Sequence, residues 1–184
     1  MILFRLGGFK VKGLHNLPPD GGVIIASNHV NFWDAVLVAI AAKRPVHFIG
    51  KAELFKNPLS SWFFYHLHAF PVKRGAPDRK AIRTAMDIVE QGNILGIFPE
   101  GTRQDSKAHT GVAMIALKTG IDVIPAACVG TQGKVLPWGW FKPLEVRIGP
   151  AVKMSDYQDR NVNSALLDTV SNDIMTKING LLLK

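Results

Sequence analysis

The sequence predicts an α/β fold in a single domain, in which strands alternate with crossover helices. The chain has 184 residues, close to the roughly 150 residues of a typical domain. Hydrophobic residues make up 47% and charged residues 20%, a balance typical of globular rather than disordered chains. Short apolar, β-branched runs alternate with segments of helical period, which indicates an α/β layer architecture. We therefore expect one domain over residues 1–184.

Seven short runs are predicted to be strands because β-branched and aromatic residues favour extended backbone. They lie at residues 10–13, 23–27, 46–50, 70–73, 94–98, 123–129 and 144–148. Residues 18–22 and 137–139 are rich in Pro and Gly and are predicted to be loops within the domain. We find no internal repeat or Ser/Gly linker that would mark a domain boundary.

Helical periodicity predicts five helices between and after these strands. They lie at residues 32–42, 59–68, 78–91, 111–119 and 164–182. In the last of them, apolar residues recur three or four positions apart and form one stripe, which predicts core packing. The stripe consists of Leu166, Val170, Ile174, Ile178 and Leu181.

The charge balance points to an anionic partner. Lys and Arg number 22 and Asp and Glu 14, giving a net charge of +8, which favours nucleic acid, an anionic membrane or a phosphorylated substrate. The basic residues are scattered, as in Lys43-Arg44 and Arg79-Lys80, without a basic arm, a zinc-finger spacing or an aromatic RNA-binding signature. We therefore do not expect nucleic acid as the partner.

The single cysteine and the hydropathy indicate the compartment. One Cys excludes an internal disulfide framework, so a reducing compartment such as the cytoplasm is expected. No apolar run is long enough for a transmembrane helix, and residues 1–8 do not resemble a secretory signal. We expect the chain to begin close to its folded domain. Cys128 lies in the apolar run 123–129 and is predicted to be a buried structural thiol rather than an acyl-accepting nucleophile.

The first candidate site is the turn at residues 27–34, between a predicted strand and a predicted helix. Asn31 is a suitable helix N-cap, which would put Asp34 in the first helical turn and His29 in the preceding loop. There Asp34 could accept a hydrogen bond from one ring nitrogen of His29 and leave the other free as a general base. The alternative is an Asp34 that only stabilises the helix dipole beside a surface His29.

The second candidate site, residues 98–103, follows the predicted strand 94–97, where α/β folds place ligand loops. Gly101 allows close approach to the backbone, Thr102 offers a hydroxyl, and Arg103 offers a planar group suited to phosphate. The alternative is an ordinary turn, with Arg103 solvated or paired with Glu100.

A third segment, residues 70–75, ends another strand with Lys73 and Arg74 before Gly75. These cations could make a second phosphate contact or form a solvated basic turn. Motifs of several other enzyme classes are missing: the phosphate-binding loop of nucleotide triphosphatases, the G-x-G-x-x-G turn, the G-x-S-x-G elbow and the H-E-x-x-H metal helix. Kinase, dehydrogenase, serine hydrolase and zinc protease readings are therefore disfavoured.

Together, these motifs resemble a known family. Asn28-His29-x4-Asp34 (an HX4D motif), residues 70–74, 98–103 and 123–126 resemble, in the same order, the four blocks of the glycerolipid acyltransferases, specifically the bacterial (PlsC-type) 1-acylglycerol-3-phosphate acyltransferases. The resemblance covers roughly residues 10–150. It implies a mixed, largely parallel sheet flanked by helices.

The resemblance also implies roles for individual residues. His29 would be the general base and Asp34 its orienting partner. The glycerol-phosphate site would be shaped by Arg74, Glu100, Gly101, Thr102 and Arg103. The chain has Gln104 where the family often has Ser, and Lys73 where a smaller residue is usual, which leaves the headgroup of the acceptor open. The implied reaction is direct acyl transfer from coenzyme A or acyl carrier protein to the 2-hydroxyl of lysophosphatidic acid, without ATP, metal or other cofactor.

Two alternatives remain at this stage: another acceptor, such as glycerol-3-phosphate or a different lysolipid, or a catalytically silent protein that binds anionic membranes. Lipid substrates would require the protein to reach a membrane, and we expect peripheral attachment at its cytoplasmic face. Two segments combine apolar, aromatic and basic residues as membrane-interface segments do. Core packing is the alternative explanation for at least half of the aromatics. The residues are Leu59, Trp62, Phe63, Tyr65, Phe70, Trp138, Trp140, Phe141 and Lys142.

Overall fold

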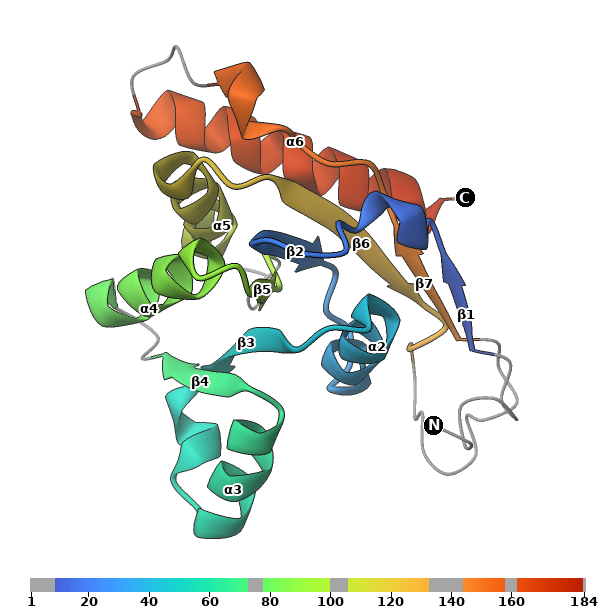
Figure 1. The fold of residues 1–184 in the computed structure, drawn as a ribbon, viewed down its shortest axis with the longest axis vertical. Coiled ribbons are helices and arrows are strands. Elements are labelled where there is room, and N and C mark those ends of the chain that lie inside the picture. The colour runs from blue at the N-terminus through green and yellow to red at the C-terminus, as the bar shows by residue number, and fades with distance from the viewer. Residues whose placement is uncertain (1–8, 73–77, 100–105, 133–143, 158–161, 184) are drawn as a thin grey trace.

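The computed structural model describes residues 9–72, 78–99, 106–132, 144–157 and 162–183, with side chains from residue 110 onward in the third range. Its centre is a seven-stranded sheet in the order β1-β7-β6-β2-β5-β3-β4 (Figure 1). Neighbouring strands are parallel except β6 and β7, which confirms the predicted mixed, largely parallel sheet. The strands are β1 (Lys10–Lys12), β2 (Val23–Ser27), β3 (Val46–Lys51), β4 (Ala69–Val72), β5 (Ile94–Ile97), β6 (Val123–Val129) and β7 (Glu145–Ile148).

The predicted helices are all present, and their ends differ from the predictions by up to five residues. They are α2 (Trp33–Ala42), α3 (Pro58–His66), α4 (Arg79–Glu90), α5 (Ser106–Thr119) and α6 (Ser164–Leu182). Helix α5 begins five residues before the predicted start, because Gly111 lies inside the helix rather than at its beginning. Helix α3 ends before the predicted His68, whose backbone has φ 54° and lies outside the helical region.

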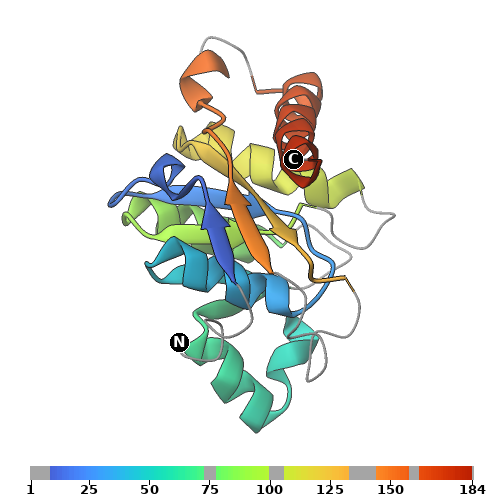
Figure 2. The same ribbon diagram turned by 90° about the vertical axis from the view of Figure 1, so that its right-hand side faces the viewer.

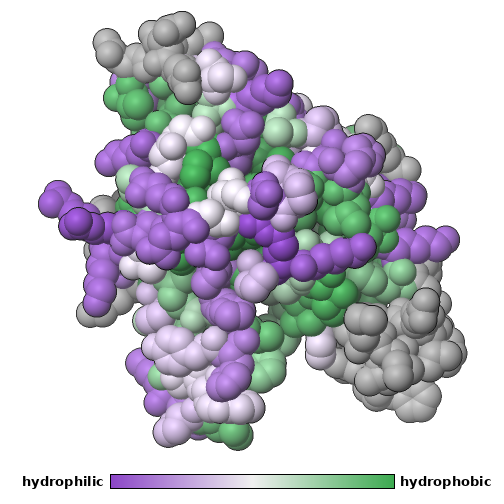
Figure 3. All heavy atoms as spheres, viewed as in Figure 1, coloured by the Kyte–Doolittle hydropathy of each residue, from purple (hydrophilic) through white to green (hydrophobic). Residues whose placement is uncertain are grey.

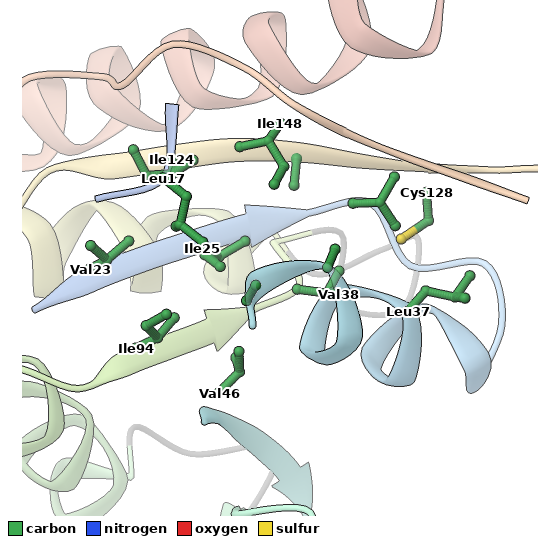
Figure 4. Close-up of a cluster of buried hydrophobic side chains, with 14 of the residues drawn as sticks. Leu17, Val23, Ile25, Leu37, Val38, Val46, Ile94, Ile124, Cys128 and Ile148 are labelled. Atoms are coloured by element: carbon green, nitrogen blue, oxygen red, sulfur yellow. The ribbon is translucent and has the colours of Figure 1, made fainter. Parts of the chain in front are cut away.

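Helices cover both faces of the sheet (Figures 1 and 2). In β2, Val23 and Ile25 pack in the core on the α2 side, and Ile24 and Ala26 pack in the core formed with α4, α5 and α6. This alternation follows from the two-residue period of a strand. Figure 4 shows the core on the α2 side, with Cys128 among its side chains. Because both faces are covered, every residue of β2 is buried, and its first four residues form a continuous apolar run before Ser27.

The C-terminal helix α6 packs as its stripe predicts. All five stripe residues are buried, and each such side chain contributes about 1.5–3 kcal/mol when fully buried. The helix begins where the side chain of Asn163 accepts a hydrogen bond from the Leu166 N–H at 2.9 Å, a standard N-cap. Within the described ranges, no helix has both the length and the apolar character that crossing a membrane requires.

Two central strands bring the first two candidate sites to the same edge of the sheet. Strands β2 and β5 pair in parallel, with Ala26 opposite Ile97, so the residues after both strands leave from adjacent carboxyl ends. From β2 the chain passes through α2, on one face of the sheet, to β3. From β5 it passes through α5, on the opposite face, to β6. In open α/β sheets, ligands bind where adjacent connections diverge in this way.

Candidate active site

The loop that carries His29 is anchored by Asn28, which is buried at the end of β2. The Asn28 side chain accepts a hydrogen bond from the Cys128 N–H at 2.7 Å and donates one to the Cys128 carbonyl at 3.1 Å. Because a carboxamide offers a donor and an acceptor as a peptide group does, this pair continues the contact between β2 and β6 past the last residue of β2. The following residue, His29, therefore starts from a fixed position.

The turn after His29 is closed by side-chain hydrogen bonds of Asn31 and Asp34 at the start of α2. The Asn31 side chain accepts a hydrogen bond from the Trp33 N–H at 3.4 Å. In return, Oδ2 of Asp34 accepts the N–H groups of Val30 at 2.6 Å and Asn31 at 2.7 Å. The N-cap of α2 is Phe32, one residue after the predicted Asn31, and it makes no side-chain cap bond, so only the return of the Asp34 side chain to the Asn31 N–H resembles a capping box. The Asp34 carboxylate therefore points towards the loop of His29.

The structure brings His29 and Asp34 together. The distance from His29 Nδ1 to Asp34 Oδ2 is 3.6 Å, and the His29 side chain is 45% exposed whereas that of Asp34 is fully buried. Since Nδ1 faces the carboxylate, Nε2 lies on the opposite side of the ring. A proton on Nδ1 would be directed at Asp34, leaving Nε2 as the nitrogen able to accept a proton.

The surroundings of Asp34 keep it ionised. Burial raises the pKa of Asp34, but the nearby His29 side chain, the Asn31 N–H, the Thr131 hydroxyl and the Val30 N–H together outweigh burial and lower the pKa below its ordinary value of 3.8. Thr131 is buried, although in this conformation its hydroxyl and Asp34 Oδ1 have no partner at hydrogen-bonding geometry within the described residues. An ionised Asp34 can stabilise the imidazolium that forms when His29 accepts a proton.

Phe98 fixes the His29 ring from a second direction. The two rings stack with centroids 4.3 Å apart and planes at 26°, and Phe98 in turn stacks on Phe48 at 5.7 Å. Phe98 is the first residue after β5, so the parallel pairing of β2 with β5 explains a contact between two motifs far apart in sequence. The imidazole is therefore positioned by Asp34 at its edge and by Phe98 at its face.

The predicted phosphate-binding residues lie outside the described residues: Arg74, Glu100, Gly101, Thr102 and Arg103. Arg74 follows β4, and residues 100–103 follow β5. These two strands run parallel with β3 between them, so their carboxyl ends share one edge of the sheet. The roles of these residues stay predictions.

Three residues of the site were not predicted in their observed roles. Asn28 and Phe98 stood within the motifs, but their partners, Cys128 and His29, are distant in sequence and only the strand order brings them close. Thr131 follows β6 and carries no motif at all. A sequence signal for these contacts would require knowledge of which strands are neighbours.

A sequence model of the family described as Acyltransferase matches residues 8–129, a range that includes His29, Asp34 and Phe98. The chain belongs to the Acyltransferase family. A relative from Bacillus subtilis, named 1-acyl-sn-glycerol-3-phosphate acyltransferase, is 34% identical over 163 residues, which cover 85% of this chain and 80% of the relative. This match confirms the resemblance to 1-acylglycerol-3-phosphate acyltransferases that the sequence motifs indicated.

Two further comparisons extend this result. A lyso-ornithine lipid O-acyltransferase from Pseudomonas aeruginosa is 30% identical over 114 residues, which cover 59% of this acyltransferase and 43% of that protein. The crystal structure of the 1-acyl-sn-glycerophosphate (LPA) acyltransferase PlsC from Thermotoga maritima matches with a TM-score of 0.67 and 24% identity, over 98% of this chain and 78% of that one. The structural match supports the fold.

Cys128 of this acyltransferase is buried, as predicted, and lies behind the site. Its sulfur is 3.8 Å from the Asp34 carbonyl oxygen and 3.8 Å from the Ser27 hydroxyl. Burial raises the pKa of the thiol to about 12, the negative charge of Asp34 adds to the rise, and the hydrogen bond with Ser27 opposes it. A thiol with this pKa is almost entirely protonated at neutral pH and is a poor nucleophile.

We expect Cys128→Ala to retain close to wild-type acyl transfer, and we expect the native Cys128 to resist alkylation. With a pKa of about 12, only about one thiol in ten thousand is ionised at pH 8. Iodoacetamide labelling followed by mass spectrometry should show modification in denaturant but little in the folded protein. Rapid labelling of the native protein, together with an inactive but folded Cys128→Ala variant, would instead indicate cysteine-based acyl exchange.

Proposed function

We propose that the protein is a 1-acyl-sn-glycerol-3-phosphate acyltransferase, which transfers a fatty acyl group from a thioester to the 2-hydroxyl of lysophosphatidic acid and produces phosphatidic acid. The observation that carries the proposal is the pairing of the half-exposed His29 ring with the buried carboxylate of Asp34, Nδ1 to Oδ2 at 3.6 Å. The name of the Bacillus subtilis relative supports the choice of lysophosphatidic acid as acceptor.

In the proposed reaction, His29 acts as a general base through Nε2. It removes the proton from the 2-hydroxyl as the oxygen attacks the thioester carbonyl carbon. The tetrahedral intermediate then collapses, the carbon–sulfur bond breaks, and the leaving thiolate takes the proton from the imidazolium. Because the thioester is already activated, the proposal needs no ATP, metal or covalent enzyme intermediate. Asp34 holds the Nδ1–H tautomer and stabilises the positive charge between the two proton transfers.

The phosphate of the acceptor would be held by the cationic segments that follow β4 and β5. In the proposal, Arg74 and Arg103 bind the phosphate, while Glu100, Gly101 and Thr102 shape the glycerol portion of the site. Two arginines suit a phosphate because their planar groups bind it in a bidentate manner. Holding the substrate so that its hydroxyl meets the thioester can supply a large part of the rate enhancement.

A second candidate is acyl transfer to a different lysolipid by the same site. The lyso-ornithine lipid O-acyltransferase of Pseudomonas aeruginosa is 30% identical over 114 residues. Its name gives a different acceptor, a lyso-ornithine lipid, and this favours the alternative. The general base and the thioester chemistry would be the same, and the headgroup contacts would differ.

We also propose that the protein works at the cytoplasmic face of the cell membrane as a peripheral protein. The acceptor and the product of the proposed reaction are membrane lipids, and the net charge of +8 favours an anionic lipid surface. The acyl donor, on coenzyme A or acyl carrier protein, would arrive from the aqueous side.

The test is an activity assay over a grid of acceptors and donors with the purified protein. Acceptors would include lysophosphatidic acid, glycerol-3-phosphate, lysophosphatidylcholine and a lyso-ornithine lipid, and donors would include acyl-coenzyme A and acyl carrier protein thioesters. We expect thiol release that depends on lysophosphatidic acid and forms phosphatidic acid in equal amount. Thiol release that is independent of any acceptor, or that is fastest with another acceptor, would overturn the choice of lysophosphatidic acid.

A further inference from the structure

Helix α3 differs from the other α-helices described because none of its residues is buried. It lies beyond β4 at the end of the molecule opposite α6 (Figures 1 and 2). Its aromatic contacts with the 3-10 helix η2 (Ala52–Phe55) are those of Phe64 and Tyr65 with Phe55, at ring-centroid distances of 5.7 Å and 5.1 Å. Among the described residues, the side chains on the opposite side of the helix are exposed.

The open side of α3 carries large apolar and aromatic side chains, together with neighbours from η2 and the His29 loop. We call this set the α3 patch; its members are between 38% and 77% exposed, and they are Phe32, Leu54, Leu59, Trp62, Phe63 and Tyr65. Figure 3 shows the α3 end of the molecule with green side chains at its tip and pale ones over much of its surface. Six such side chains grouped on one part of a surface indicate an interaction site.

The α3 patch is continuous with the candidate active site. Phe32 lies two residues before Asp34, and its ring centroid is 6.3 Å from that of Phe63 and 6.0 Å from that of Phe64. On the same loop, Val30 next to His29 is 52% exposed. A membrane in contact with the α3 patch would therefore lie beside the His29 ring.

The composition of the patch matches a lipid bilayer surface. Trp62 and Tyr65 each combine an apolar ring with a polar N–H or O–H, which suits the boundary between acyl chains and headgroups. Lys51 and Lys56 flank η2 and are exposed, with exposed Glu53 between them. The two lysines exceed the one acidic residue, so this segment adds attraction for anionic headgroups.

We propose that the α3 patch is the surface by which the protein inserts into a lipid bilayer, with Lys51 and Lys56 contacting anionic headgroups, so that the loop of His29 lies at the level of the substrate headgroup. The inference rests on the proposed function for the identity of the lipid substrate. It goes beyond that function by naming the segment that enters the membrane.

The test compares Leu59→Ser/Trp62→Ser with a matched control, Leu183→Ser, which replaces a 90% exposed leucine after α6, at the other end of the molecule. Each protein is sedimented with phosphatidylcholine vesicles that contain phosphatidylglycerol. We expect the double variant to bind at least about a hundredfold more weakly, because each of the two inserted side chains contributes roughly ten- to a hundredfold in partitioning. The control should bind as the wild type does.

Activity with substrates that need no membrane separates this inference from the proposed function. A short-chain, monomeric lysophosphatidic acid and a short-chain acyl-coenzyme A should be turned over equally by wild type and the double variant, whereas turnover of vesicle-bound long-chain acceptor should fall with binding. If wild type does not use the soluble pair, the proposed function fails. If it does, but the double variant binds vesicles as tightly as wild type, the α3 patch is not the insertion surface.

Two further measurements test whether Lys51 and Lys56 attract anionic lipids and whether a bilayer or a second copy of the chain occupies the α3 patch. Lys51→Glu/Lys56→Glu should weaken binding to vesicles with phosphatidylglycerol by about fivefold or more per residue, at roughly 1 kcal/mol each, and leave binding to pure phosphatidylcholine unchanged. Sedimentation velocity without lipid should give the same monomeric mass for wild type and Leu59→Ser/Trp62→Ser. A dimer that only the double variant abolishes would show that a second copy of the chain occupies the patch.

Discussion

Replacing His29 with alanine should lower the rate of acyl transfer by about 10²- to 10⁴-fold, the usual contribution of a general base. The variant should remain folded, because the His29 side chain is 45% exposed and its loop is held by Asn28 and Asp34 rather than by the imidazole. Steady-state kinetics with lysophosphatidic acid and an acyl thioester would show the loss mainly in kcat.

The control for this variant is His15→Ala, which removes an exposed imidazole from the 3-10 helix at Leu14–Asn16. It should leave kcat and stability unchanged. A His29→Ala protein that melts at the wild-type temperature and turns over at the wild-type rate would remove His29 from the mechanism. Loss of activity together with loss of the folded state would call for His29→Gln as a more conservative replacement.

The second large effect is expected at Asp34. Asp34→Ala should reduce activity by an amount similar to His29→Ala and also reduce the free energy of unfolding by about 1–2 kcal/mol, because the N–H groups of Val30 and Asn31 lose their acceptor. Asp34→Asn should recover most of the stability, since its amide oxygen can accept both N–H groups. It should recover less of the activity, because a neutral amide does not stabilise the imidazolium.

Urea unfolding and kinetics on the same preparations would separate the two roles of Asp34. Asn163→Ala is the matched control, since it removes the cap of α6 at similar cost in stability and should not change kcat. An Asp34→Asn variant with wild-type activity would show that the carboxylate acts only as a helix cap.

The lowered pKa of Asp34 gives its contribution a definite pH dependence. In the unfolded chain the Asp34 carboxyl has its ordinary pKa of 3.8, and in the folded chain its pKa is lower. Below pH 3.8 the unfolded carboxyl binds a proton that the folded carboxyl resists. The stabilisation is therefore fully present above pH 3.8 and is lost as the pH falls through the pKa of the folded state. The difference in unfolding free energy between wild type and Asp34→Asn should therefore shrink in strongly acidic solution. A difference that grows on acidification would contradict the sign of the shift.

The sequence predicted the strands and helices well because their patterns are local. The continuous apolar run of β2 and the stripe of α6 each follow from a period within one segment. Helix ends were predicted less accurately where the deciding residue was ambiguous: Gly111 is tolerated inside α5, and the positive φ of His68 has no clear local signal.

The candidate site was predictable only where its members share one turn. The pairing of His29 with Asp34 depends on the short turn into α2, whose polar residues Asn31 and Asp34 are visible in the sequence, although the N-cap itself is Phe32. By contrast, the bonds of Asn28 to the Cys128 backbone, the stacking of Phe98 on His29 and the effect of Thr131 on Asp34 depend on the strand order β6-β2-β5. Motifs listed along the chain do not contain that order, because it is fixed by packing of the whole sheet.

The absence of buried side chains in α3 has a consequence for how the molecule can change. A segment that contributes little to the core can open locally at low free energy while the rest of the chain remains folded. Mutations on α3 should therefore have little effect on folding, so its exposed surface can change independently of the core that positions His29.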